Sequence, residues 1–271
     1  MIIDSHTHVW TLEPRRYPWQ PIGGYIPEAP ASYTTLRAEM QSAGVDRAVL
    51  VQPTPYGWNN CYLLDVVKTA PDAFRAVCLV DPFSPGGPAE LERLVHDHGV
   101  SGVRINWHLE KPQRWLDDPA HLALWARAQQ VGTPICLQLT SPYLSLVRTF
   151  AVRYPGVKIV IDHLGRPEAG STSTAASFVS FLALCELPQV YVKIAGLYYY
   201  SLGAAPYEDT WGLVKAAVAT FTPPRCLWGS DFPFVDQRWS YPAMIDTLRD
   251  LFKDPQALDW ILGKTAETLW P

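Results

Sequence analysis

Residues 134–163, PICLQLTSPYLSLVRTFAVRYPGVKIVIDH, contain the pattern that decides the fold. Pro134–Leu139 and Lys158–His163 are short apolar runs without clean polar alternation, which is typical of parallel strands buried on both faces. Leu144–Tyr154 lies between them and has the pattern of a helix. The stretch therefore predicts one strand–helix–strand unit.

The same unit recurs along the whole chain. Further helices are predicted at Ala89–His98, His121–Gln130 and Tyr207–Thr220, and further strands at Ile2–His8, Ala48–Gln52, Ala76–Asp81, Gly102–Asn106, Val190–Ala195 and Cys226–Asp231. About eight repeats in 271 residues predict a single domain over residues 1–271, folded as a (β/α)₈ TIM-type barrel. A doubly wound open sheet is the alternative, but the Gly-rich phosphate turn that it usually carries does not follow the first strand.

A long irregular segment follows the first predicted strand. Thr11–Ser32 includes PRRYPWQPIGGYIPEAP, which is too rich in Pro and Gly for a helix or strand. A barrel places its variable loops where substrate binds. The segment is therefore either a wall or lid of the pocket or a packed connector.

The composition excludes several classes of protein. The formal net charge is −4, without the clustered Lys and Arg that nucleic acid or an anionic membrane calls for. No stretch reaches the roughly 18 apolar residues of a membrane span, and the N-terminus MIIDSHTHVW does not read as a signal peptide. The five cysteines are odd in number and form no CxxC pair, so we interpret them as structural thiols. We expect a cytoplasmic protein with a small-molecule partner, and the exposed aromatic residues permit a homodimer.

Four side chains are predicted to meet at the carboxyl end of the barrel. His6 and His8 lie two residues apart on the first strand and therefore share a face, and Asp4 belongs to the same row. His163 ends the sixth predicted strand and Asp231 ends the eighth. Inward polar groups at a strand end are costly unless they serve a site, because the barrel interior is otherwise apolar. We therefore interpret the histidines and Asp231 as catalytic.

Two kinds of chemistry are open to this set. Imidazole and carboxylate groups suit a divalent ion such as zinc or manganese, for which His6, His8, His163 and Asp231 are the candidate ligands. Without a metal, Asp231 can take a proton from water while the histidines polarise a carbonyl.

A series of motifs carries a resemblance that runs over essentially the whole length. They read DSHTHVW, VDRAVLVQP, FRAVCLVDP, GVRIN, KIVIDHLGRP, VYVKIAG, LWGSDFP and ILGKTAETLW. With them the chain resembles the amidohydrolase-related family, in the branch that contains 2-pyrone-4,6-dicarboxylate lactonase and the sugar lactonases. HxH and SDFP are shared by the wider superfamily, whereas DHLG together with GVR is more particular to this branch.

The resemblance implies hydrolysis of a small lactone, either a sugar lactone or a carboxylated ring-cleavage lactone, with Asp231 activating water. It leaves the metal open, because members of this branch work without one while relatives bind zinc. A metal-dependent decarboxylase or hydratase, which is a lyase, is the alternative. The decarboxylases carry a ligand histidine at the fifth strand, where this chain has Gln138, a poor zinc ligand.

Substrate-binding residues are predicted on and after several strands. Arg104 and Asn106 share a face of the fourth strand, and a guanidinium there can hold a carboxylate with two hydrogen bonds. The alternative for Arg104 is a buried ion pair with Asp81 or Asp4. Lys193 lies within the seventh strand, where its charge needs a partner. The remaining candidates lie at or after strand ends, with packing as the alternative role of the tyrosines: Gln52, Tyr56, Asn59 and Tyr198, the last of which opens a run of tyrosines after the seventh strand.

Overall fold

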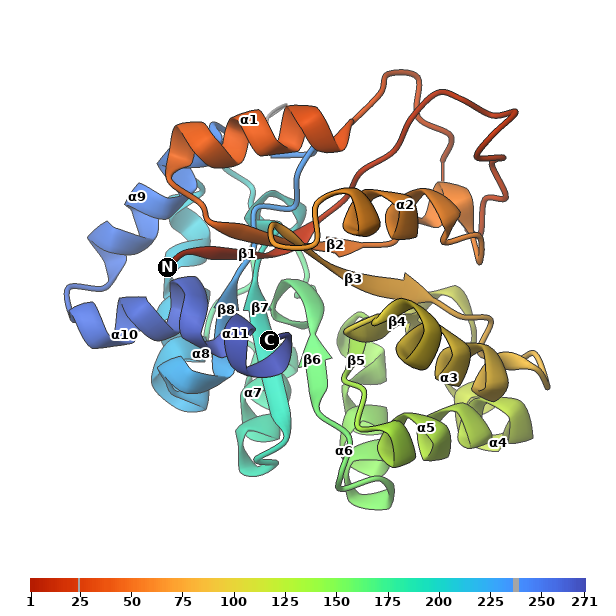
Figure 1. The fold of residues 1–271 in the computed structure, drawn as a ribbon. Coiled ribbons are helices and arrows are strands. Elements are labelled where there is room, and N and C mark those ends of the chain that lie inside the picture. The colour runs from red at the N-terminus through yellow and green to blue at the C-terminus, as the bar shows by residue number, and fades with distance from the viewer. Residues whose placement is uncertain (24, 236–238) are drawn as a thin grey trace.

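The structure is a computed structural model that describes residues 1–23, 25–235 and 239–271. Its eight strands form one parallel sheet in sequence order from β1 to β8, with the helices arranged outside (Figure 1). This is the (β/α)₈ barrel that the sequence predicted. The strands are β1 Ile3–Thr7, β2 Arg47–Val51, β3 Phe74–Leu79, β4 Gly102–Asn106, β5 Ile135–Gln138, β6 Ile159–Ile161, β7 Val190–Ile194 and β8 Cys226–Trp228.

Most strands end before the predicted carboxyl boundary. His8, Gln52, His163 and Asp231 all lie just beyond the ladder rather than inside it. The reason at two of these positions is the backbone, since φ is 54° at His163 and 61° at Asp231, which a strand cannot contain. The ends of the apolar runs therefore belong to the loops that build the site.

All four predicted helices are present, as α3, α5, α6 and α8, but their boundaries differ. α8 begins four residues later than predicted, because a 3₁₀ turn, Glu208–Thr210, precedes it. The bounds are α1 Tyr33–Ala43, α2 Cys61–Thr69, α3 Gly87–His98, α4 Pro112–Asp117, α5 Pro119–Val131, α6 Leu144–Arg153, α7 Ala176–Leu182, α8 Trp211–Phe221, α9 Tyr241–Leu251, α10 Pro255–Asp259 and α11 Thr265–Leu269. Among the residues that the structure describes, no helix has the length and apolar character needed to cross a bilayer.

Local sequence explains where a helix such as α5 starts and stops. The Asp118 carboxylate accepts the backbone N–H of Ala120 at 2.9 Å, and Pro119 occupies the first helical position, where no N–H is needed. Gly132 ends the helix at φ 71°, a conformation that glycine adopts without a steric cost.

One end of the barrel is sealed by the chain's own C-terminus. Leu269 and Trp270 pack with apolar residues of the barrel interior, so α11 lies across the end near both termini (Figure 1). Polar groups are left to the opposite end. The interior residues of this cluster are Ile3, Val49, Val51, Val77, Cys136, Val160 and Leu227.

A bulge in β1 changes the face on which Asp4 lies. Between Asp4 and Thr7 the register shifts, so β1 has one more residue than β2 over this span. Asp4 therefore does not share the row of the two histidines, contrary to the prediction. Its carboxylate accepts hydrogen bonds from the backbone N–H of Ser230 at 2.9 Å and from the hydroxyl of Tyr241 in α9. Burial raises the pKa of Asp4 to about 6, while these hydrogen bonds act to lower it.

The barrel closes between β1 and the segment after β8. The backbone N–H of His8 donates to the Phe232 carbonyl and that of Asp231 donates to the His6 carbonyl, each at 2.8 Å. Gly229 lies against this joint, and a Cβ there would meet the Cβ of His6 at 2.7 Å. The closing bonds thus involve the same residues that carry the candidate catalytic side chains.

We expect Gly229→Ala to push β1 away from the segment after β8, because its Cβ would also lie 3.0 Å from the backbone nitrogen of His6. The expected loss is about 1–3 kcal/mol in the free energy of unfolding, measured by urea denaturation. Gly212→Ala in α8 is the control, since its Cβ meets no described atom within 4 Å. It should be neutral or stabilising by up to about 1 kcal/mol. Equal stability of both variants would contradict a tight closure.

Candidate active site

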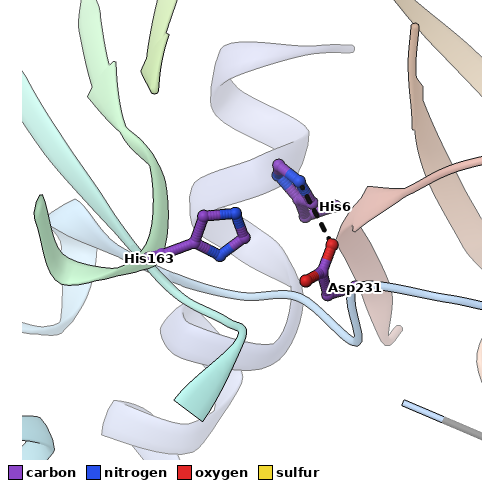
Figure 2. Close-up of side chains that lie close together, drawn as sticks. All are labelled: His6, His163 and Asp231. Carbon is purple, nitrogen blue, oxygen red and sulfur yellow. Dashed lines mark ion pairs between the residues drawn. The ribbon is translucent and has the colours of Figure 1, made fainter. Parts of the chain in front are cut away.

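The structure brings the predicted histidines and Asp231 together at the carboxyl end of the barrel. Oδ1 of Asp231 lies 3.4 Å from Nε2 of His8 and 3.6 Å from Nε2 of His6. Donor atoms of His6, His163 and Asp231 all lie within 4.8 Å of one another. Figure 2 shows these three side chains directed toward one another from three separate segments.

Left-handed backbone turns hold two of these side chains in place. His163 and Asp231 both have positive φ, at 54° and 61°, and Leu164 follows with 52°. Residues other than glycine rarely adopt this conformation, and it costs about 1–3 kcal/mol where it occurs. Such strain clusters at functional sites, and the two candidate residues are among the six described non-glycine residues with positive φ.

The ring of His8 is oriented by a backbone carbonyl. Its Nδ1 lies 2.8 Å from the carbonyl oxygen of Val51, which can only accept, so Nδ1 carries a proton. In the neutral ring, Nε2 is then an acceptor that faces the carboxylate of Asp231. Two acceptors at 3.4 Å are stabilised by a cation between them, which is either a proton on Nε2 or a metal ion.

Three buried polar atoms of the cluster formed by the histidines and Asp231 have no hydrogen-bond partner within the described part of the chain. They are Nε2 of His6, Nδ1 of His163 and Oδ1 of Asp231. Buried polar atoms are nearly always paired, and an unpaired one calls for a ligand, water or ion as its explanation. All three belong to one cluster, so this cluster is the natural place for a reacting group or a metal.

Two of the distances in the cluster fit a divalent metal ion. Four ligands about 2.0–2.2 Å from a tetrahedral zinc ion lie about 3.3–3.6 Å from one another. The two distances from Asp231 to the β1 histidines, 3.4 and 3.6 Å, match that range. A metal-ligating histidine also usually donates its other N–H to a carbonyl, as His8 does to Val51.

His6 stands between a cation and an anion. Its Nδ1 lies 3.1 Å from Nζ of Lys193 and 3.4 Å from Oδ1 of Asp162. If Nδ1 accepts from Lys193, the proton of the neutral ring is on Nε2 and faces Asp231. If Nδ1 instead donates to Asp162, Nε2 is free to bind a metal. Burial, followed by the charge of Lys193, holds the pKa of His6 well below its usual value, so the ring is neutral in either tautomer.

The partner of Arg104 is Asp162. Nε of Arg104 donates to Oδ2 of Asp162 at 2.9 Å, and Nζ of Lys193 lies 3.2 Å from Oδ1. The buried ion pair that was the alternative for Arg104 is thus present, with Asp162 in place of Asp81 or Asp4. Asp162 also supplies the partner that Lys193 needs. Burial acts to raise the pKa of Asp162, but Lys193, His6 and Arg104 together hold it well below its usual value.

Only one carboxylate oxygen of Asp231 has a hydrogen-bond partner among the described residues. The hydroxyl of Tyr198 donates to Oδ2, which leaves Oδ1 toward the histidines. Burial acts to raise the pKa of Asp231, but His163, His8 and His6 hold it below its usual range. Burial and the negative charge of Asp231 raise the pKa of Tyr198, so the phenol keeps its proton and remains a donor.

Two hollows open beside the cluster. The first has a volume of about 100 Å³ and is lined by His8, Tyr25, Pro53, Thr54, Pro55, Arg104, Gln138, His163, Tyr199 and Phe234. The second has a volume of about 270 Å³ and is lined by Ile22, Gly23, Trp58, Val80, Pro82, Phe83, Arg104, Ile105, Asn106, Leu109, Glu110 and Trp115. Residues of the loop after β1 line both, so that loop forms part of the pocket wall.

Several predicted substrate-binding residues lie elsewhere. The hydroxyl of Tyr56 bonds to the backbone of Thr11, and Nε2 of Gln52 donates to the carbonyl of Asn59 at 2.6 Å. Gln52, Tyr56 and Asn59 are absent from the described linings of both hollows, and their role in substrate binding stays a prediction. Arg104 and Asn106 do line a hollow, and Tyr198 contacts Asp231.

Asp162 is a residue of the cluster that the sequence analysis missed, whereas Tyr199 belongs to the run of tyrosines that it expected after the seventh strand. Asp162 had a visible signal, because it directly follows the apolar run IVI. Ile161 pairs with Val192, so the next residues along the two strands are Asp162 and Lys193. Tyr199 lies in a 3₁₀ turn after β7.

Comparison with known proteins gives the family. The sequence profile of the amidohydrolase family matches residues 3–271. The chain belongs to this family. It is an enzyme of the amidohydrolase superfamily, and its HxH and SDFP motifs are the segments that carry His6, His8 and Asp231.

Its relatives include characterised lactone hydrolases. The L-fucono-1,5-lactonase of Burkholderia ambifaria is 30% identical over 237 residues, which cover 85% of this chain and 80% of that protein. The 2-pyrone-4,6-dicarboxylate hydrolase of Comamonas testosteroni is 27% identical and covers 98% and 85% of the two chains. The fold is shared with an amidohydrolase from Burkholderia multivorans solved with bound zinc, at 23% identity, full coverage of both chains and a TM-score of 0.81.

Asp162 should be energetically coupled to Lys193 in this amidohydrolase. We expect Asp162→Asn and Lys193→Met each to cost about 3–5 kcal/mol, because each leaves a buried charge without its partner. The double variant should cost less than the sum, by about 0.5–3 kcal/mol, measured by urea unfolding. The exposed pair Lys264–Asp259 at 3.0 Å is the control, with a coupling below about 1 kcal/mol. Additive costs at Asp162 and Lys193 would contradict the buried pair.

Proposed function

We propose that this amidohydrolase hydrolyses a small lactone by attack of water on the ring ester, with Asp231 as the general base. The observation that carries the proposal is Oδ1 of Asp231, which is buried, has no hydrogen-bond partner among the described residues and lies 3.4 Å from Nε2 of His8. The names of the relatives, a sugar lactonase and a pyrone dicarboxylate hydrolase, support a lactone as the substrate class.

Asp231 is suited to move a proton during this reaction. Its lowered pKa keeps it ionised at neutral pH, and Tyr198 holds Oδ2 so that Oδ1 faces the attacking water. Oδ1 takes a proton as the water oxygen bonds to the carbonyl carbon. The ring C–O bond then breaks, and the ring oxygen receives that proton from Asp231. A histidine N–H that faces the substrate polarises the carbonyl oxygen as negative charge develops on it. His6 and His163 can supply this N–H as neutral rings, whereas His8 needs a second proton on Nε2 because its Nδ1 already donates to a backbone carbonyl.

Arg104 is placed to hold the acid that ring opening produces. It lines both hollows, and its Nε is bound to Asp162, which fixes the plane of the guanidinium. The other nitrogen atoms of a guanidinium can donate two parallel hydrogen bonds to a carboxylate. We therefore assign Arg104 to substrate and product binding, with Asn106 beside it.

His6, His8, His163 and Asp231 are the residues that would hold one zinc or manganese ion. Bound there, a divalent ion supplies Lewis-acid polarisation of the carbonyl and lowers the pKa of water. The zinc in the Burkholderia multivorans relative supports this assignment. Gln138 lines the mouth of the site, and its amide does not add a ligand of the kind that zinc prefers.

Asp231→Asn should lower kcat by about 10²–10⁴-fold, because an amide cannot accept the proton from water. Acid release from glucono-1,5-lactone and δ-valerolactone in a pH-stat measures this. Asp246→Asn on the exposed face of α9 is the control and should keep full activity. Near-UV circular dichroism of both variants checks that the fold is retained. Parental turnover by the Asp231→Asn variant would remove the general-base role.

Zinc titration by calorimetry should give about one site per chain. His8→Ala should weaken that binding at least about tenfold, because a ligand aimed by Val51 is lost. His96→Ala, on the exposed surface of α3, should leave it unchanged. Activity before and after chelation then separates the routes: loss assigns carbonyl polarisation to the ion, and undiminished turnover assigns it to the histidines. An unchanged zinc affinity of the His8→Ala variant would refute the proposed metal site.

A further inference from the structure

Two hollows of opposite character share Arg104 as a wall. The smaller one contains polar groups of the catalytic cluster, namely His8 and His163. The larger one is walled mainly by apolar side chains, among them Phe83, Leu109 and Trp115. Because Arg104 lines both, a molecule bound by its guanidinium can extend into each.

The larger hollow has room for an aromatic ring or a short alkyl chain. Its volume is about 270 Å³, whereas an engineered apolar cavity of about 150 Å³ is enough for benzene. The smaller hollow, at about 100 Å³, has room for little more than the lactone ring. A substituent on that ring is therefore directed toward the apolar side of Arg104.

The chemistry of the walls selects against a polyhydroxylated substituent. Hydroxyl groups lose hydrogen bonds to water when they enter an apolar hollow, at a cost of about 1–3 kcal/mol each. The polar side chains that line this hollow are Arg104, Asn106 and Glu110, and the amide of Asn106 is buried without a partner in the described structure. The amide of Asn106 thus offers one donor and one acceptor beside Arg104, and the rest of the space favours carbon.

We propose that the larger hollow is a substrate subsite, and that the lactone hydrolysed here carries an aromatic or alkyl substituent rather than the hydroxyls of a sugar. The inference rests on the proposed lactone hydrolysis and adds the substrate class. The loop after β1 contributes Ile22 and Gly23 to this subsite, and Trp58 covers it from the segment after β2.

The test compares three lactones of the same ring size: δ-valerolactone, its derivative with a phenyl group on the carbon next to the ring oxygen, and glucono-1,5-lactone. We expect kcat/KM for the phenyl derivative to exceed that of δ-valerolactone at least about tenfold. Glucono-1,5-lactone should be the poorest of the three. An equal or reversed order between the phenyl and hydroxylated lactones would overturn the substrate class.

Two variants tie the preference to the hollow. Leu109→Trp should fill it and lower the ratio of phenyl to unsubstituted kcat/KM at least about tenfold, and Trp58→Ala should lower the ratio about threefold by opening the wall. Leu64→Trp, on α2 and outside the lining, is the control and should keep the parental ratio. Thermal melts check folding, and Trp58→Ala keeps the test open if Leu109→Trp does not fold. A ratio that neither variant changes would refute the subsite.

Binding of the ring-opened product separates this inference from the proposed function. Calorimetry should show 5-hydroxy-5-phenylpentanoate binding at least about tenfold more tightly than 5-hydroxypentanoate, and Leu109→Trp should remove the difference. If no lactone is turned over but this selective binding is seen, the subsite stands and lactone hydrolysis fails. If lactones are turned over without selectivity in binding or rate, the subsite alone fails.

Discussion

The buried carboxylate of Asp162 is the constraint on which the rest of the site depends. It neutralises Lys193 and orients Arg104 in a barrel interior that is otherwise apolar, and it lies beside Nδ1 of His6. A chain of contacts therefore runs from the ammonium of Lys193 to the carboxylate of Asp162, then to the neutral ring of His6 and to the carboxylate of Asp231. Without Asp162, the buried cations Arg104 and Lys193 would lose the anion that they share, and Nδ1 of His6 would have no anion beside it. Asp162 thus both balances the charge of the interior and orients Arg104 and His6.

How much of this could be predicted follows from the range of each interaction. The apolar runs identify all eight strands, because burial on both faces is recorded in local composition. The HxH spacing and the strand-end positions of His163 and Asp231 place the cluster. The ends of the strands were misplaced, since a left-handed turn at Asp231 leaves no local mark in the sequence. The bulge that moves Asp4 to the other face has no local sequence signal either. Nor does local sequence indicate that Arg104 pairs with Asp162, 58 residues away.

The polar residues after β2 show a different limit. Gln52, Tyr56 and Asn59 have the composition of a binding loop, but their side chains bond to backbone groups of neighbouring segments. A long loop without regular structure must satisfy its N–H and C=O groups somewhere, and nearby side chains are the means. Tyr56 does this for Thr11 at the start of the loop after β1. Sequence composition cannot separate such support from contact with a ligand, because both require the same polar groups.

The loop after β1 is attached to the barrel differently from the candidate catalytic residues. It follows the segment after β2 through backbone bonds such as Gln20 N–H to Pro55 C=O at 2.9 Å and Ile22 N–H to Thr54 C=O at 3.2 Å. Asp231 and the histidines, by contrast, are held by the barrel and its closure. Selection can therefore rewrite the length and sequence of this loop, and with them the accepted substituent, while the inherited reaction stays intact. Diversification of such a lineage is therefore expected in this loop rather than in the closure of the barrel.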